Sequence, residues 1–289
     1  MTTLSWIGLG KLGLPMAARI AGAGHAIKGH DRDPARQALA EARQIAPAED
    51  PAAADIIFTS LPDDKAMLAA FLSPDGLFAR ARPGTVIVET STVSAEASAE
   101  IAAAAGPIAY LRAPVSGNPV LAERGELTVL ASGPRAAFDA ARPFMTAISR
   151  AQHYLGEGEQ ARYAKLAINL MIAVSAGMMA EALTLARKGG VEWAQMLDLL
   201  ADSAVASPMV KYKTPPLKAR DFASTFSCRQ MSKDLDLMLA AGHAAHVPLP
   251  LAAQLRETYS ALIASGDGEV DFIATILHAE RLAGLQDPD

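Results

Sequence analysis

The sequence contains a single cysteine, Cys228, and only 5% of its 289 residues are aromatic. One cysteine cannot form a disulfide within the chain, which excludes the disulfide-stapled secreted class and favours a reducing compartment. We expect Cys228 to be a small, buried, apolar side chain. Runs of lysine or arginine with interleaved aromatics are also missing and the net charge is -5, so nucleic acid is not an expected partner.

Long apolar runs are scarce as well. The chain opens with MTTLSWIGLG, in which no basic segment precedes an apolar stretch, so we expect no secretory signal. The most apolar segment, residues 167–180, is interrupted by Asn169 and Ser175 and falls short of the ~18 to 20 apolar residues of a membrane span. These features predict a soluble, cytoplasmic protein without a membrane partner.

The six histidines show no metal-binding spacing. His243 and His246 are three residues apart in a helical stretch, but no cysteine or carboxylate motif accompanies them. We therefore expect no catalytic metal.

The first half of the chain alternates short β-rich runs with alanine-rich helical segments. This alternation is typical of the α/β class, with a doubly wound, mainly parallel sheet between helices. Because 289 residues exceed one typical domain, we expect an N-terminal Rossmann domain over residues 1–157 and a second domain after it. The expected strands are residues 4–8, 26–30, 56–60, 85–89, 108–111, 127–132 and 151–154.

Strand-like runs stop after about residue 156, which predicts an all-α C-terminal domain over residues 158–289. It should begin with one long helix over residues 159–188 that ends at Gly189 and Gly190. This helix would be about 45 Å long. Because it is apolar nearly all round, we expect it to be buried inside the second domain and against a partner subunit. Further helices are expected over residues 193–202, 227–245, 250–265 and 271–285.

A GxGxxG motif, formed by Gly8, Gly10 and Gly13, follows the first expected strand and opens the first helix. The first glycine permits a tight turn, the second lets the backbone approach a pyrophosphate, and the third allows close packing of helix on strand. The helix N-terminus favours the negative charge. The motif predicts a site for NAD or NADP, which includes the intervening Leu9, Lys11 and Leu12.

Asp31 follows Gly8 by 23 residues, at the end of the second expected strand. A carboxylate there can accept hydrogen bonds from the adenosine ribose hydroxyls and would repel a 2′-phosphate, which favours NAD. Arg32 leaves NADP open, because a guanidinium can pair with a 2′-phosphate.

Four segments resemble the β-hydroxyacid dehydrogenases, the family of 3-hydroxyisobutyrate dehydrogenase and tartronate semialdehyde reductase in the 6-phosphogluconate dehydrogenase superfamily. GLGKLGLPMA resembles the family's GxGxMGxPM opening, and RAPVSGNPVLAERGELTVLASG its substrate-binding segment. GEGEQARYAKLAIN resembles its catalytic-lysine segment, and SKDLDLML its C-terminal Lys-Asp pair. The resemblance implies that NAD(P) interconverts a small carboxylated β-hydroxyacid and its semialdehyde or keto form, in a homodimer or homotetramer.

Lys165 is the expected catalytic base. Oxidation of an alcohol needs a group that takes the hydroxyl proton while hydride leaves to the nicotinamide. Asn169 follows at i+4 on the same helical face, where it can hold the substrate oxygen. A lysine has an ordinary pKa of about 10.4, so a base role requires burial or a neighbouring cation such as Lys233.

The resemblance also implies the remaining site residues. Ser116 and Gly117 would bind the substrate's carboxylate or hydroxyl, with Asn118 beside them, and Lys233 would close the site, oriented by Asp234. Alternatively, Ser116 is a turn residue, Ser91 and Thr92 cap a helix, and Lys233 and Asp234 form a surface ion pair. The residues expected near the nicotinamide are Leu61, Pro62, Ser91, Thr92 and Lys233.

Four positions depart from the family pattern. Arg112 stands where aspartate is common, Asn118 where glycine is usual, Ile168 replaces the first of two asparagines, and Ala161 replaces a glycine. The proposed base is intact. Arg112 and Asn118 change charge and bulk near the substrate segment, so the substrate stays open.

Two other functions remain possible from the sequence. Imine reductases share the architecture and reduce C=N, but they typically lack the Lys-Asn pair. A non-catalytic dinucleotide-binding scaffold, as among nucleosome-associated relatives, would have lost the lysine and gained basic tails. The retained Lys165 favours the hydroxyacid dehydrogenase.

Overall fold

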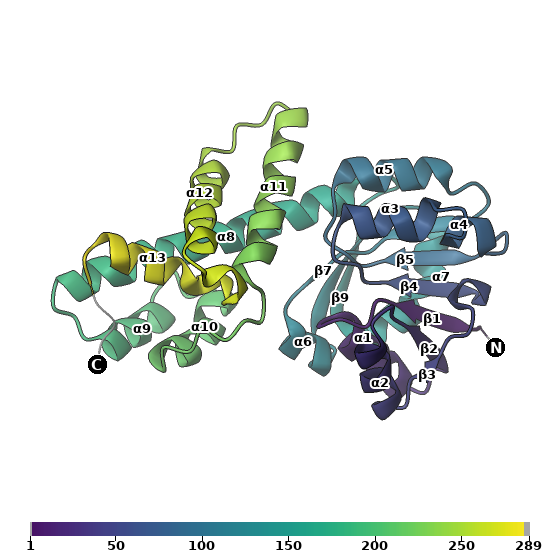
Figure 1. Cartoon of the computed structure of the whole chain (residues 1–289), viewed down its shortest axis with the longest axis horizontal. Coiled ribbons are helices and arrows are strands. Elements are labelled where there is room, and N and C mark those ends of the chain that lie inside the picture. Colours follow the sequence, from purple (N-terminus) through teal and green to yellow (C-terminus); the bar gives the residue numbers. More distant parts are fainter. Residues whose placement is uncertain (1, 286–289) are drawn as a thin grey trace. The chain divides into compact units, whose positions relative to one another are not determined.

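The computed structural model describes residues 2–285 of the chain. Contacts divide it into two compact units, Met1–Leu166 and Ala167–Asp289 (Figure 1). The domain boundary that the composition places at residue 157 stays a prediction. The long helix begins within the first unit, so the base expected at Lys165 belongs to that unit.

The first unit is built on a six-stranded parallel sheet with the order β3-β2-β1-β4-β5-β6. This order confirms the predicted Rossmann fold. It reverses between β1 and β4, and the carboxyl ends of strands at such a reversal form a ligand-binding crevice. The strands are β1 (Leu4–Ile7), β2 (Ile27–His30), β3 (Ala46–Pro47), β4 (Ile56–Thr59), β5 (Val86–Glu89) and β6 (Ala109–Arg112).

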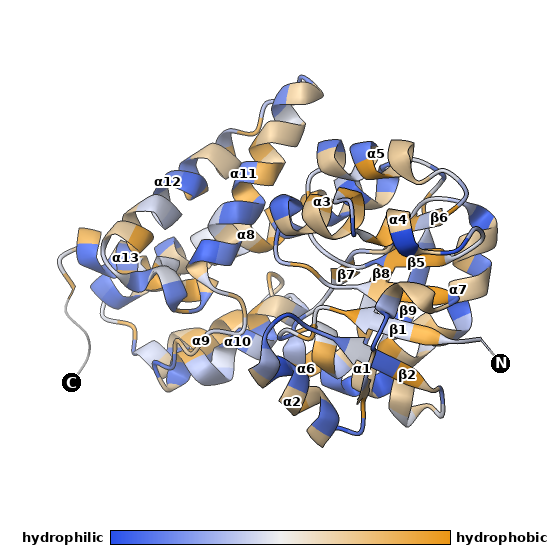
Figure 2. Ribbon diagram, turned by 45° about the vertical axis from the view of Figure 1, so that its right-hand side comes forward, coloured by the Kyte–Doolittle hydropathy of each residue, from blue (hydrophilic) through white to orange (hydrophobic). Residues whose placement is uncertain are grey.

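Helices cover both faces of this sheet because its central strands are apolar on both sides. Phe58 and Val88 pack on one side, and Ile57 and Ile87 on the other. Figure 2 shows hydrophobic colours along the central strand β5 and mixed colours along the covering helices. One face carries α1 (Gly13–Gly22), α2 (Pro34–Ala42) and α7 (Arg135–Ile148); the other carries α3 (Asp64–Leu72), α4 (Leu77–Arg80) and α5 (Ala95–Ala104), with the short turn η1 (Pro51–Ala53) before β4.

A second, three-stranded sheet follows β6. It has the order β7-β8-β9, with β7 antiparallel and β9 parallel to β8. Strands β3 and β7 were not predicted, because two residues are too short to show an alternating pattern. The elements are β7 (Val115–Ser116), α6 (Pro119–Arg124), β8 (Leu127–Ala131) and β9 (Ser149–Tyr154).

The second unit is helical, as predicted. Among the residues described after β9, the only β pairing is an isolated bridge between Ser227 and Asp271. The last expected helix is broken, because Asp271 caps a separate 3-10 turn with its side chain. The elements are α8 (Gln160–Lys188), α9 (Trp193–Asp202), α10 (Pro208–Lys218), α11 (Cys228–Ala244), α12 (Pro250–Ala264), η2 (Asp267–Glu269), η3 (Phe272–Ala274) and α13 (Thr275–Leu282).

Helix α10 was not predicted, because it contains three prolines and proline usually ends a helix. Pro208 is tolerated at the first turn, where the side chain of Ser207 caps the helix. Pro215 and Pro216 lie inside the helix.

Helix α8 is the long apolar element that the sequence predicts. Its length and composition would allow it to cross a membrane, a test that the core helix of a soluble protein also passes. The sequence argument from length therefore does not exclude a membrane span, and the soluble state stays a prediction. Only 39% of the most apolar stretch of α8 is buried within this chain. The chain alone therefore does not bury this helix on all sides, as the sequence led us to expect. Its exposed apolar side chains include Met171, Met178 and Leu185.

Candidate active site

The glycine loop after β1 is open beside Gly10 and tightly packed at Gly13. A Cβ atom on Gly13 would lie 1.9 Å from the carbonyl oxygen of Gly8, so only glycine allows this contact between helix and loop. A Cβ atom on Gly10 would meet nothing closer than Arg36 Nη1 at 3.8 Å. The start of α1 has no side-chain cap, and a helix N-terminus favours negative charge. The loop therefore fits the pyrophosphate of a dinucleotide.

The neighbouring loop residues divide between core and surface. Leu9 is buried in the core beside the sheet, and Leu12 is partly buried. Lys11 is exposed beside Gly10.

Asp31, at the end of β2, holds the glycine loop. Its carboxylate accepts hydrogen bonds from the backbone N–H of Leu9 at 2.7 Å and of Asp33 at 2.9 Å. Arg36 Nη1 lies 3.7 Å from the same carboxylate, and Arg32 is exposed. A role in reading the adenosine ribose stays a prediction for Asp31 and Arg32.

The residues expected near the nicotinamide lie on the loops after β4 and β5. The backbone N–H of Leu61 donates to Ser91 Oγ at 2.7 Å, which joins these two loops. Pro62 is exposed and Thr92 is partly buried. Ser91 and Thr92 do not cap α5, because the cap is Ser94, whose side chain accepts from Ala97 N–H.

The expected substrate segment surrounds β7. Ser116 pairs with Thr128 on β8, so it is not simply a turn residue. Gly117 has a φ of +143°, a conformation that L side chains rarely adopt, and a Cβ atom there would lie 2.5 Å from Leu127 Cδ2. Asn118 caps α6, with its Oδ1 accepting from the N–H of Leu121 at 3.0 Å. The family departure at Asn118 thus has a local structural role in starting α6.

Lys165 lies in the second turn of α8, with only 7% of its surface exposed. Asn169 follows one turn later on the same helix and is also buried.

In the second unit, Asn169 donates from Nδ2 to Oδ2 of the buried Asp234 at 2.6 Å. Lys233 Nζ lies 2.9 Å from the other oxygen of Asp234, as a charge contact rather than a directed hydrogen bond. Lys233 and Asp234 thus form an ion pair, as one sequence interpretation proposed, but Asp234 is buried and connects Lys233 to Asn169.

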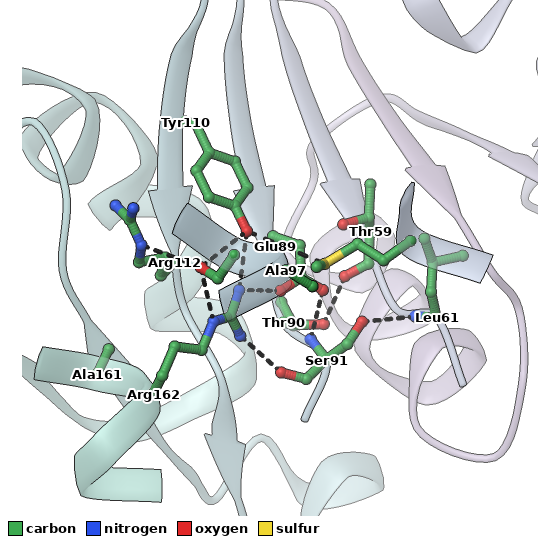
Figure 3. A network of polar contacts seen from close by, with 12 residues as sticks. Thr59, Leu61, Glu89, Thr90, Ser91, Ala97, Tyr110, Arg112, Ala161 and Arg162 are labelled. Atoms are coloured by element: carbon green, nitrogen blue, oxygen red, sulfur yellow. Dashed lines mark hydrogen bonds and ion pairs between the residues drawn. The ribbon is translucent and has the colours of Figure 1, made fainter. Parts of the chain in front are cut away.

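A buried polar network that was not predicted from the sequence lies at the carboxyl ends of β5 and β6 (Figure 3). Arg162, on the first turn of α8, forms an ion pair with Glu89 at the end of β5. It also donates to the hydroxyl of Tyr110 at 3.0 Å and to Ser98 Oγ at 3.2 Å. Burial opposes the charge on Arg162, but the neighbouring Glu89 outweighs it and raises the pKa of Arg162. Burial likewise raises the pKa of Tyr110.

Arg112 belongs to the same network. It forms an ion pair with Glu159 and donates from Nε to Ser98 Oγ at 3.1 Å. The positive charge of Arg112, which departs from the family pattern, is therefore balanced by Glu159 within the same unit. The sequence signal for this network was Glu89, a charged residue at the end of an apolar strand. Its partner Arg162 is 73 residues away, so the sequence does not show that the two meet.

Among the residues described, no group of three or more histidine, cysteine or acidic side chains could hold a metal ion. The absence of a catalytic metal stays a prediction.

Comparison with known proteins agrees with the fold and with the glycine loop. A family model described as the NAD binding domain of 6-phosphogluconate dehydrogenase matches residues 3–156. A second, described as NAD-binding of NADP-dependent 3-hydroxyisobutyrate dehydrogenase, matches residues 159–279. The two models together span both halves of the chain.

Individual relatives match over nearly the whole length. 2-(Hydroxymethyl)glutarate dehydrogenase of Eubacterium barkeri is 32% identical, over 98% of this chain and 96% of its own. 3-Hydroxyisobutyrate dehydrogenase of Pseudomonas aeruginosa is 31% identical, over 93% and 94%. A solved 3-hydroxyisobutyrate dehydrogenase of Mycobacterium tuberculosis with L-serine has a TM-score of 0.85 at 29% identity, covering 96% of this chain and 99% of its own. The chain therefore belongs to the β-hydroxyacid dehydrogenase family and is an NAD(P)-dependent hydroxyacid dehydrogenase.

Proposed function

We propose that this enzyme interconverts a small carboxylated β-hydroxyacid and its semialdehyde or keto form, with Lys165 as general acid and base. The observation that carries the proposal is the buried Lys165 one helical turn before Asn169, whose amide is oriented by Asp234. Relatives named as dehydrogenases of 3-hydroxyisobutyrate and 2-(hydroxymethyl)glutarate support this substrate class.

The chemistry assigned to the chain's residues is proton transfer and positioning. In the oxidation direction, the neutral amine of Lys165 takes the hydroxyl proton. The carbon that bears this hydroxyl loses its hydrogen, with the C–H electron pair, as hydride. When bound, NAD or NADP supplies the hydride acceptor. Asn169 holds the reacting oxygen in line, and in the reverse direction the Lys165 ammonium returns the proton.

Ser116 and Gly117 would bind the substrate carboxylate through the serine hydroxyl and backbone N–H groups. Charge-assisted hydrogen bonds of this kind are stronger than neutral ones, so they would select a carboxylated substrate. Lys233 would add a positive charge to the site. We further propose NAD as the preferred cofactor, because of Asp31. A cytoplasmic location and a homodimer or homotetramer remain predictions from the sequence.

A substrate screen tests the proposal. The purified protein is assayed by absorbance at 340 nm with NAD and NADP, in both directions, against 3-hydroxyisobutyrate, 2-(hydroxymethyl)glutarate, L-serine and tartronate semialdehyde. We expect turnover of at least one of these acids. Tight NADH binding with no turnover of any hydroxyacid would favour the non-catalytic scaffold. Reduction of a cyclic imine, with no hydroxyacid turnover, would favour the imine reductase alternative.

A further inference from the structure

The backbone of Ser91 is held from both sides by the buried Glu89–Arg162 pair (Figure 3). Its N–H donates to Glu89 Oε1 at 2.7 Å, and its carbonyl oxygen accepts from Arg162 Nη1 at 2.8 Å. Its hydroxyl oxygen accepts from the N–H of Leu61 at 2.7 Å. Each of these contacts lies within the first unit. The two loops expected under the nicotinamide are therefore fixed to one ion pair.

The same pair fixes the start of the helix that carries Lys165. Arg162 lies three residues before Lys165 on α8, a spacing that places both on one side of the helix. The side chains of Arg162 and Glu89 are 1% and 0% exposed, so water does not compete for their hydrogen bonds. Glu89 uses one oxygen for Ser91 and the other for Arg162, which leaves the pair a single arrangement.

A buried ion pair is a poor device for stability alone, because apolar side chains of similar volume often serve as well or better. Apolar side chains could not hold the N–H and the carbonyl of Ser91. The contacts that an apolar pair would lose therefore include both hydrogen bonds that hold the backbone of the cofactor loop.

We propose that Glu89 and Arg162 are positioning residues, which fix the Leu61–Ser91 wall of the cofactor site relative to Lys165. Their effect on Lys165 rests on the function proposed above, whereas their effect on cofactor binding does not. The nicotinamide would lie on a wall whose position is set by the same side chains that set the start of α8.

The test compares Glu89→Gln and Arg162→Lys with the double variant Glu89→Leu/Arg162→Met. Fluorescence titration measures the Kd for NADH and NADPH, and thermal unfolding measures Tm. Each single variant should raise the Kd about tenfold, as expected for lost charge-assisted hydrogen bonds, and lower Tm. In the double variant no unpaired charge is buried, but the backbone of Ser91 loses both partners, so Tm should recover in part while the Kd stays raised.

The matched control is Arg112→Met/Glu159→Gln. It removes the second Arg–Glu pair of this network, in which Arg112 is buried and Glu159 is partly buried. This pair also meets Ser98, and among the described residues neither member forms a hydrogen bond to Ser91. Its Kd for NADH should stay within about twofold of the wild type. With a substrate from the screen, the Glu89→Leu/Arg162→Met variant should also show a lower kcat and a larger primary deuterium isotope effect, because misplaced reactants slow hydride transfer.

Recovery of the Kd together with Tm in the double variant would overturn the inference, since the pair would then act on stability alone. An equal rise in Kd in the Arg112→Met/Glu159→Gln control would overturn it too. If neither single variant folds, the double variant and Tyr110→Phe, which removes one hydrogen bond from Arg162, carry the same comparison. A wild type that binds NADH but oxidises no hydroxyacid refutes the proposed function and leaves the cofactor measurements decisive.

Discussion

Asn169 can place only its amide nitrogen against Asp234, because an ionised carboxylate accepts hydrogen bonds and cannot donate them. The 2.6 Å contact from Nδ2 to Oδ2 therefore fixes which way the amide faces. The amide oxygen of Asn169 is thereby turned away from Asp234. Asp234 is itself buried, so this orientation is not exchanged with water.

Replacing Asp234 with alanine should lower kcat by about tenfold to a hundredfold, because Asn169 loses its fixed orientation and misplaces the substrate oxygen. Asp234→Asn should cost less, since its amide oxygen can still accept from Asn169. The control is Asp236→Ala on the same helix, where the exposed carboxylate pairs with Arg256. Steady-state kinetics with the substrate from the screen measure kcat for each variant. Equal kcat values for Asp234→Ala and Asp236→Ala would contradict the role of Asp234 in orienting Asn169.

Replacing Lys165 with methionine should lower turnover by roughly 10² to 10⁴, the contribution of general acid–base catalysis, while folding and NADH affinity are retained. Lys188→Met is the control, at the exposed end of the same helix. Turnover and NADH titration are measured on both variants. Wild-type activity in Lys165→Met would remove this residue from the mechanism.

The fold could be predicted from the sequence where a periodic pattern was long enough. Strands of four or more residues and the 29-residue α8 carry such patterns, and the glycines after β1 fixed the Rossmann interpretation. Strands β3 and β7 have two residues each and carry none. Helix α10 was hidden by prolines that normally end helices, although Ser207 and Pro208 together are a helix-start signal.

Candidate site residues were identifiable from the sequence where residue types at short spacing express the chemistry, as for Gly8, Gly10, Gly13 and for Lys165 with Asn169, and their roles stay predictions. The Glu89–Arg162 pair was not, because its members are far apart in sequence and their meeting depends on how strand β5 and helix α8 pack. The same holds for Asp234, which was expected to orient Lys233 and also holds Asn169.

Two alanine substitutions in the glycine loop should separate folding from cofactor binding. Gly10→Ala places its Cβ in open space, so Tm should change little while the Kd for NADH rises at least tenfold by obstruction of the pyrophosphate. Gly13→Ala drives its Cβ against the Gly8 carbonyl and should lower Tm by several degrees. Thermal unfolding and NADH titration check both, and a large Tm loss in Gly10→Ala with unchanged Kd would contradict the placement.

The buried thiol of Cys228 should make the protein less stable at alkaline pH. Burial, followed by the charge of Asp271, raises the pKa of Cys228 from its usual 9.0 to about 12. Above pH 9 the unfolded chain releases this proton and the folded chain retains it, so stability is full below pH 9 and falls as the pH rises toward 12. The free energy of unfolding in urea at pH 8 and pH 10.5 should therefore fall less in Cys228→Ala than in the wild type. Tyr259, whose pKa burial also raises, accounts for part of the decline that remains in both. Identical declines would show that the thiol does not contribute.

Cofactor choice should depend on the charge of Asp31 separately from its hold on the glycine loop. Asp31→Asn removes the charge but keeps an oxygen that can accept from the N–H of Leu9, so the loop should keep its conformation. Without the carboxylate, repulsion of a 2′-phosphate falls and Arg32 can pair with it, so we expect the NADPH affinity relative to NADH to rise about tenfold. Asp31→Ser should shift the ratio in the same direction but weaken both cofactors, because the serine side chain is too short to replace the 2.7 Å hydrogen bond to Leu9. Fluorescence titrations with NADH and NADPH measure the ratio. If the ratio is unchanged in both variants, the ribose is read by other residues, and the preference for NAD does not follow from Asp31.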